Sequence, residues 1–140
     1  MTLPTSAGLV VDTSAVVALL QAEDGSDALL DRLARPGRRL MSDAIRVEPG
    51  IVVEARFGPP GQDVVDRFVR DAEIEVVAVD ADTADRALQA WRRYGKGRHR
   101  AALTFGDCFS YALADHSGLP LLCTGSDFAA TDLEMAVAEG

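Results

Sequence analysis

Residues 8–20 read GLVVDTSAVVALL, and this stretch predicts a strand followed by a helix, the repeating unit of an α/β fold. The apolar run before Asp12 is typical of a strand that is buried on both faces of a sheet. After Asp12 the apolar residues continue over a length that favours a helix. Asp12 therefore projects from the carboxyl end of a central strand, which is the edge where open α/β sheets bind ligands and metals.

The rest of the chain alternates between strand and helix patterns, and turn residues such as Gly25, Pro36 and Gly58 separate them. We predict strands at 8–12, 38–41, 75–79 (buried) and 119–123, and we consider a last strand at 134–138. We predict helices at 13–22, 26–34, from Ser42 to Gly58, 61–72, 81–94 and 106–118. This alternation predicts an α/β fold with a central parallel sheet and helices on both faces.

Composition limits the domain organisation and the class of protein. The chain has 140 residues, of which 48% are apolar and 26% charged, so we expect one domain spanning residues 1–140. A net charge of −8 opposes binding to a polyanion. Only two cysteines occur, no secretory signal or membrane-spanning stretch is evident, and we expect a cytoplasmic protein.

Four acids stand where strands end or helices lie: Asp12, Glu48, Asp107 and Asp127. Four carboxylates in one place would repel each other unless a cation were bound, so their convergence would indicate a divalent-metal site. Most of them also have a purely structural explanation. Asp12 can cap the following helix, Asp107 has the capping-box spacing from Thr104, and Asp127 can be a turn residue.

Glu48 is harder to explain as a structural residue. Its neighbours one helical turn away are all apolar, which places its carboxylate on a stripe expected to face the core. A carboxylate in that position is costly unless it is paired or bound to a metal.

The motifs around these acids resemble those of PIN-domain ribonucleases, specifically the VapC-type toxins of bacterial toxin-antitoxin pairs. The resemblance rests on VDTSA (11–15), Glu48 before IVVEAR (51–56), GDCFSYALA (106–114) and GSDF (125–128), in the family's order and over nearly the whole chain. It implies a PIN-like three-layer α/β/α domain. It also implies an acidic cluster that holds Mg²⁺ or Mn²⁺ for hydrolysis of RNA, and carboxylate oxygens suit these hard cations.

The family's acids can be carried over residue by residue. Three match directly, whereas many relatives have the fourth acid where this chain has Gly125, which leaves Asp127 as the candidate and Asp132 in reserve. The resemblance therefore implies the catalytic set Asp12, Glu48, Asp107 and Asp127, with Asp12 and Asp107 as direct metal ligands.

Two residues depart from the family pattern. Pro49 follows Glu48 inside the predicted helix, where proline removes a hydrogen bond and bends the backbone, so we expect Glu48 to sit differently than in relatives. Thr104 stands where an asparagine is frequent in similar toxins, so that any polar role there falls to a hydroxyl.

A basic run lies between Arg92 and Arg100, immediately before Asp107. Its cations can supply the phosphate contacts that an acidic protein otherwise lacks, or they can be a solvated helix end that complements the helix dipole. We predict RNA contacts at Arg93, Lys96, Arg98 and Arg100. The adjacent Trp91 and Tyr94 can stack on bases, although aromatic residues on a helix more often belong to the core.

The resemblance also implies partners. A VapB-like antitoxin would cover the acidic groove with its C-terminal segment, where an arginine could reach the carboxylates, and the toxin would form a homodimer. Three alternatives stay open: a receiver-like Mg²⁺-binding module, a Mg²⁺-dependent phosphohydrolase of another α/β family, and a catalytically weak or inactive PIN-like binding module. The first would need a strand-end lysine, but Lys96 in the basic run is the only lysine in the chain.

Overall fold

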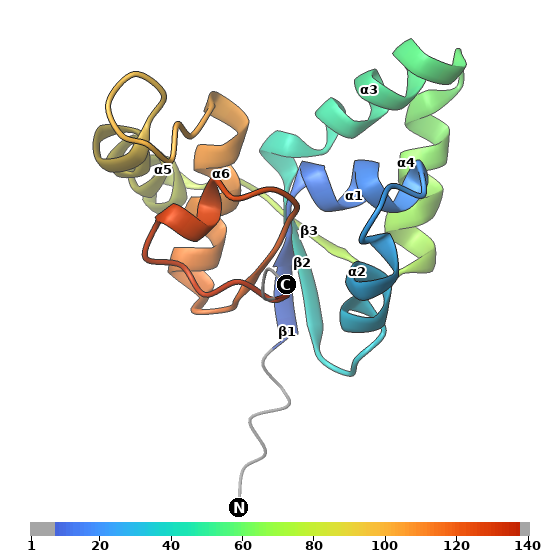
Figure 1. The fold of residues 1–140 in the computed structure, drawn as a ribbon, viewed down its shortest axis with the longest axis horizontal. Coiled ribbons are helices and arrows are strands. Elements are labelled where there is room, and N and C mark those ends of the chain that lie inside the picture. Colours follow the sequence, from blue (N-terminus) through green and yellow to red (C-terminus); the bar gives the residue numbers. More distant parts are fainter. Residues whose placement is uncertain (1–7, 138–140) are drawn as a thin grey trace, which may run out of the picture.

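The computed structural model describes residues 8–137 and contains a four-stranded, all-parallel sheet (Figure 1). Its strands lie in the order β3-β2-β1-β4. They are β1 (Gly8–Val11), β2 (Arg38–Ser42), β3 (Glu75–Val77) and β4 (Leu121–Leu122). Val10 pairs with Leu40 on one side and with Leu121 on the other, so β1 is central as predicted.

Helices cover both faces of the sheet, which confirms the predicted three-layer α/β/α architecture (Figure 1). The α-helices are α1 (Thr13–Leu20), α2 (Ser26–Leu33), α3 (Val47–Phe57), α4 (Gly61–Asp71), α5 (Ala81–Tyr94) and α6 (Phe105–Ser117). Two short 3-10 helices, η2 (Asp43–Ile45) and η3 (Phe128–Ala130), precede α3 and follow β4. No described helix has the length and apolar character needed to cross a membrane.

The alternation of side chains along β1 divides the core into two clusters. Leu9 and Val11 pack in a cluster with residues of α1 to α4, whereas Val10 packs in a second cluster with residues of α5 and α6. All three side chains are at most 2% exposed. The uninterrupted apolar run at the start of the chain is thus explained by burial on both faces.

Two of the predicted strands differ from the structure. β3 is an edge strand that ends at Val77, and it is only half-buried because it has a neighbouring strand on one side alone. Its exposed Glu75 pairs with Arg38 of β2 at 2.7 Å. In the predicted last strand, Met135 forms only an isolated parallel bridge with Leu121, and residue 138 lies outside the described part of the chain.

The third helix also begins differently than predicted. Ser42 caps the short η2, where its hydroxyl accepts from the backbone N–H of Ala44, and α3 starts only at Val47. Pro49 therefore lies in the first turn of α3 and not in a helix interior. Because backbone N–H groups in a first turn have no partner within the helix, proline is tolerated there and no bend follows from it.

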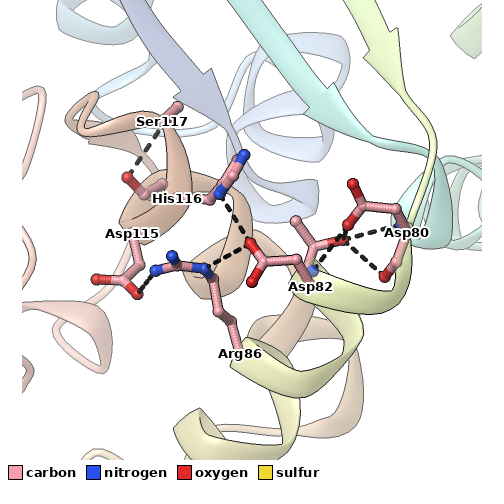
Figure 2. Close-up of polar contacts among 8 residues, drawn as sticks. Asp80, Asp82, Arg86, Asp115, His116 and Ser117 are labelled. Carbon is pink, nitrogen blue, oxygen red and sulfur yellow. Dashed lines mark hydrogen bonds and ion pairs between the residues drawn. The ribbon is translucent and has the colours of Figure 1, made fainter.

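Helices α5 and α6 are joined by a polar network at the carboxyl end of α6 (Figure 2). Asp107 lies in the first turn of α6, at its other end. Arg86 donates to Asp82 at 3.0 Å and to Asp115 at 2.8 Å, and His116 lies 3.0 Å from Asp82. Such half-exposed pairs contribute little to stability, and the two helices are held together mainly by buried residues of the second core cluster.

The order of strands creates a topological switch point between β1 and β4. From β1 the chain builds β2 and β3 on one side and later returns to place β4 on the other, so the connections diverge between β1 and β4. Ligand sites in open parallel sheets lie at the carboxyl ends of strands at such a switch point. Asp12 directly follows β1, and the segment containing Asp127 follows β4.

Candidate active site

The Asp12 carboxylate is buried at this carboxyl edge of the sheet and held by two serine hydroxyls. Asp12 is 3% exposed, and its side chain caps α1. Oδ2 accepts from the backbone N–H of Ser14 at 3.0 Å and from its hydroxyl at 2.7 Å. Oδ1 accepts from the hydroxyl of Ser110 at 2.5 Å. The orientation of the carboxylate is therefore fixed through both oxygens.

These serines tie together three parts of the chain that are distant in sequence. Ser14 also accepts from the backbone N–H of Thr124, just beyond β4, at 3.0 Å. Ser110 is completely buried in α6, one helical turn after Asp107. The sequence analysis missed Ser110, although a hydroxyl within the apolar run of α6 is itself a signal, because a buried polar group needs a partner.

Asp107 serves as a helix cap and also faces the acidic edge. In the capping box of α6, its Oδ2 accepts from the backbone N–H of Thr104 at 2.9 Å, and its own backbone N–H donates to the Thr104 hydroxyl at 3.4 Å. The structural explanation offered for this acid is thus confirmed. It leaves Asp107 Oδ1 available for other partners.

The electrostatics of Asp12 and Asp107 link all four predicted acids. Burial raises the pKa of Asp12, the two serines oppose this rise, and the charge of Glu48 adds to it. Burial also raises the pKa of Asp107, with further contributions from the charges of Asp12 and Asp127. The neighbouring charges that act on these two carboxyl groups are thus those of other acids.

Glu48 lies at the start of α3 and contradicts the expectation of a core-facing stripe. The residue is exposed, and so are Ile51 and Val52 on the same helix, so that apolar surface faces outward. Its carboxylate nevertheless points toward the start of α6: a Cβ placed on Gly106 would lie 3.1 Å from Glu48 Oε1. The glycine before Asp107 therefore leaves room for the Glu48 carboxylate.

The two candidates for the fourth acid have different surroundings. Asp127 is exposed at the start of η3 and contributes to the field at Asp107. Asp132 accepts a hydrogen bond from the hydroxyl of Tyr111 and lies 4.0 Å from Arg93. These partners occupy Asp132 in a local structural role, which favours Asp127.

The acids surround the edge without forming a closed cage. Among residues 8–137, no three acidic, histidine or cysteine side chains are placed so that they could hold a metal ion as they stand. The donor set still suits a hard divalent cation, because it consists of carboxylate oxygens and includes a buried carboxylate surrounded by other negative charges. The residues present therefore fit Mg²⁺ or Mn²⁺.

The basic run forms the exposed end of α5 and the loop that leads to α6. Arg93 donates to the hydroxyl of Tyr94 at 2.9 Å, and Arg98 lies over the ring of Trp91 at 4.7 Å. Lys96 and Arg100 are exposed and make no ion pair within the described residues. The four cations predicted to contact RNA thus include two with local partners and two without.

Of the two aromatic residues next to the basic run, one belongs to the core and the other is exposed and could stack on a base. Tyr94 is 8% exposed and belongs to the core beside Tyr111. Trp91 is 43% exposed, so it remains accessible at the surface.

Known proteins resemble this chain over most of its length. The PIN domain family matches residues 9–134. Ribonuclease VapC of Mycolicibacterium smegmatis is 52% identical over 125 residues, which cover 89% of this chain and 97% of the relative. Ribonuclease VapC30 of Mycobacterium tuberculosis is 50% identical over 125 residues, covering 89% and 95%.

Solved structures show the same fold at low sequence identity. The Mycobacterium tuberculosis VapC20 structure, described as a sarcin-ricin loop cleaving toxin, has a TM-score of 0.73 at 22% identity and covers 90% of this chain and 96% of its own. The VapBC2 structure of Rickettsia felis, bound to a DNA fragment from its promoter, has a TM-score of 0.69 at 14% identity, covering 91% and 96%.

Proposed function

The chain belongs to the PIN-domain family as a VapC-type ribonuclease toxin, and we propose that it hydrolyses RNA phosphodiester bonds with Mg²⁺ or Mn²⁺ held at Asp12 and Asp107. The observation that carries this proposal is the Asp12 carboxylate, which is buried at the carboxyl end of β1, fixed by Ser14 and Ser110, and lies in the field of Glu48. A structural helix cap needs none of this isolation from solvent, whereas a metal ligand benefits from it.

Each residue has a distinct task in the proposed mechanism. Asp12 and Asp107 enter the reaction with preset orientations, because the two serines hold one and the backbone of Thr104 holds the other. When bound, the cation would neutralise charge on the attacked phosphate and make a water more acidic. The exposed Glu48 and Asp127 orient water at the rim, and one of them accepts the proton of the attacking water.

The basic run supplies the contacts to the phosphates of the RNA backbone. Arg93, Lys96, Arg98 and Arg100 lie on α5 and on the loop that leads directly to the α6 end carrying Asp107. Their charges attract phosphates locally, although the chain as a whole carries −8. The RNA would therefore enter from this side.

We also propose the partners and the setting of the toxin. A cognate VapB-like antitoxin would block the acidic groove. One solved structure with this fold, from Klebsiella pneumoniae, is described as a toxin-antitoxin complex, and another is VapBC2 of Rickettsia felis. Residues 1–140 would act as one PIN-like domain, within a homodimer in the cytoplasm. Membership of the PIN family removes the receiver-like module and the phosphohydrolase of another α/β family as alternatives.

The experiment that tests this function is a cleavage assay with the chain purified away from any antitoxin. We expect it to cleave RNA in the presence of Mg²⁺ or Mn²⁺ and to stop when EDTA is added. Asp107→Asn should reduce the rate by orders of magnitude while the circular dichroism spectrum stays native. Asp115→Asn is the matched control, because it removes the same charge from the far end of α6.

Two results would overturn the proposal. Cleavage that survives both EDTA and Asp107→Asn would mean that the chemistry is different or that a contaminant is active. A well-folded protein that cleaves no RNA from total cellular RNA under any metal condition would instead support an inactive PIN-like binding module.

A further inference from the structure

An apolar groove with a volume of about 590 Å³ runs between α5 and the start of α6. Leu88 and Trp91 of α5 line one side, and Phe105 and Phe109 of α6 line the other. Phe105 is 80% exposed and Trp91 is 43% exposed. Exposed aromatic rings around one hollow are unusual for a surface with no binding task.

The groove adjoins the acidic site. Thr104 lines it, and the backbone N–H of the same residue holds the Asp107 carboxylate. Phe105 is separated from Asp107 by Gly106 alone. Asp107 itself lies outside the lining, so the groove and the acidic site meet at Thr104, and a polymer bound at Asp107 would reach the groove past that residue.

The charges around the groove suit an anionic ligand. Its lining contains no acidic residue, and Lys96 is the one charged residue in it. Arg98 lies over the Trp91 ring at 4.7 Å, which adds a second cation at the rim. This is notable in a chain with 22 acidic and 14 basic residues. The apolar floor accepts a flat ring, and the cations accept the phosphate attached to it.

We propose that this groove is a nucleobase subsite, in which one unstacked base of the RNA lies against Trp91 and Phe105. The inference rests on the proposed function and deepens it, because a base can leave its stack at low cost only in single-stranded or looped RNA. An unpaired base is therefore the unit that the groove would hold. Stacking on aromatic side chains tolerates any base and strengthens binding on the order of ten- to hundredfold per base.

A protein occupant fits these observations less well. A second copy or an apolar peptide could also fill the groove, but it would itself have to place acidic partners at Lys96 and Arg98, because the lining has none. It would also not explain why the groove opens beside Asp107.

The test uses Trp91, the only tryptophan of the chain, as a reporter of groove occupancy. The Asp107→Asn variant prevents turnover and is titrated with two probes of equal length. One is a single-stranded oligouridylate, and the other is an abasic ribose-phosphate oligomer with the same charge and no bases. We expect oligouridylate to quench Trp91 fluorescence and to bind about tenfold or more tightly than the abasic oligomer, which should leave the fluorescence unchanged.

Phe105→Ala then assigns the effect to the groove. On the Asp107→Asn background it should weaken oligouridylate binding on the order of tenfold and leave abasic binding unchanged. Phe57→Ala is the matched control, because Phe57 is an exposed phenylalanine on α3, on the opposite face of the sheet. It should change neither affinity.

Several outcomes would overturn the subsite. Equal affinity for both oligomers without quenching would refute the nucleobase subsite. If the wild-type chain still cleaved RNA in that case, the proposed function would stand. Conversion of an oligomer to a monomer by Phe105→Ala, measured by light scattering, would reassign the groove to a protein contact. If neither oligomer bound and no RNA were cleaved, the proposed function would fail and the subsite with it.

Discussion

At the scale of single residues, Asp12 combines two demands that usually conflict. A carboxylate that is 3% exposed loses most of its hydration, yet it must stay available to a cation. The hydroxyls of Ser14 and Ser110 replace part of the lost water, and each donates to a different oxygen. Together with the backbone N–H of Ser14, they leave one lone pair, on Oδ1, for a metal.

Ser110→Ala should therefore weaken both the fold and the metal site. The change leaves a buried carboxylate oxygen without its donor, which we expect to cost about 1–3 kcal/mol of unfolding free energy. It should also reduce the rise in melting temperature caused by Mg²⁺. Ser117→Ala is the control, because the Ser117 hydroxyl bonds only backbone groups at the other end of α6: it donates to the carbonyl of Ala114 and accepts from the N–H of Leu119. Equal behaviour of the two variants in urea and thermal unfolding would refute the role of Ser110.

The raised pKa values of Asp12 and Asp107 predict how stability depends on pH when metal is removed. The native state binds protons that the unfolded chain, with an ordinary aspartate pKa of 3.8, has already released. The contribution of these groups to stability is therefore largest at low pH and is lost as pH rises from 3.8 through the raised values.

Asp12→Asn isolates this contribution, because asparagine does not titrate. In EDTA, the variant should become more stable relative to the parent as pH rises toward neutrality. Urea unfolding of both proteins over a pH series measures the difference. The shared carboxylates cancel in it except Asp107, whose pKa also falls when the charge of Asp12 is removed, and this adds to the difference in the same direction. A difference that stays constant with pH, or that favours the parent at neutral pH, would contradict the raised pKa of Asp12.

At the scale of elements, the ends of helices carry much of the site. Asp12 caps α1, Asp107 belongs to the capping box of α6, and Glu48 lies in the first turn of α3. The amino ends of helices attract negative charge, so these positions lower the cost of gathering carboxylates at one edge. Structural and catalytic explanations of the same acid are thus compatible.

The basic run contains cations without an ion pair, Lys96 and Arg100, and cations that contact aromatic rings, Arg93 and Arg98, and the two kinds can be compared. Lys96→Gln with Arg100→Gln should weaken RNA binding, with a shallower dependence on salt, and leave stability within about 0.5 kcal/mol, because these side chains make no ion pair in the described part of the chain. Arg93→Gln with Arg98→Gln removes the same charge but also contacts to Tyr94 and Trp91.

The second pair of substitutions should therefore also lower stability, by about 1 kcal/mol. Filter binding over a salt series, on the Asp107→Asn background, gives affinity and slope, and urea unfolding gives stability. Unchanged affinity and slope in both double variants would return the basic run to its role as a solvated helix end. RNA would then be held by another surface.

At the scale of the whole molecule, three separate connections bring the acids to one edge. Asp12 follows β1, Asp127 follows β4, and Asp107 begins a helix packed against both strands. Because the sheet is parallel, the carboxyl ends of neighbouring strands meet. The site is therefore assembled only when the whole sheet is formed.

Metal binding should consequently stabilise the whole fold. Millimolar Mg²⁺ or Mn²⁺ binds only the native arrangement and should raise the melting temperature by a few degrees, since a concentration ten times the Kd adds about 1.4 kcal/mol. Asp12→Asn combined with Asp107→Asn should abolish this rise, whereas Asp82→Asn combined with Asp115→Asn, in the network away from the site, should not. A rise that persists in the first double variant would place the metal elsewhere.

The sequence by itself determined the alternation of strands and helices, the burial of β1 on both faces and the set of acids at element ends. These features depend on local periodicity and on capping residues, and both involve residues that are close together in sequence, such as Thr104 and Asp107. The position of Pro49 was misjudged because a 3-10 turn and a helix share nearly the same local pattern.

The tertiary structure alone decided the environment of each acid. Ser110 reaches Asp12 across 98 positions in sequence, Glu48 is exposed although its neighbours are apolar, and Asp132 is occupied by Tyr111. These relations arise from the order of strands in the sheet and from the packing of α6 on it. Contacts between distant segments depend on the whole fold, and no local pattern in a single sequence encodes them.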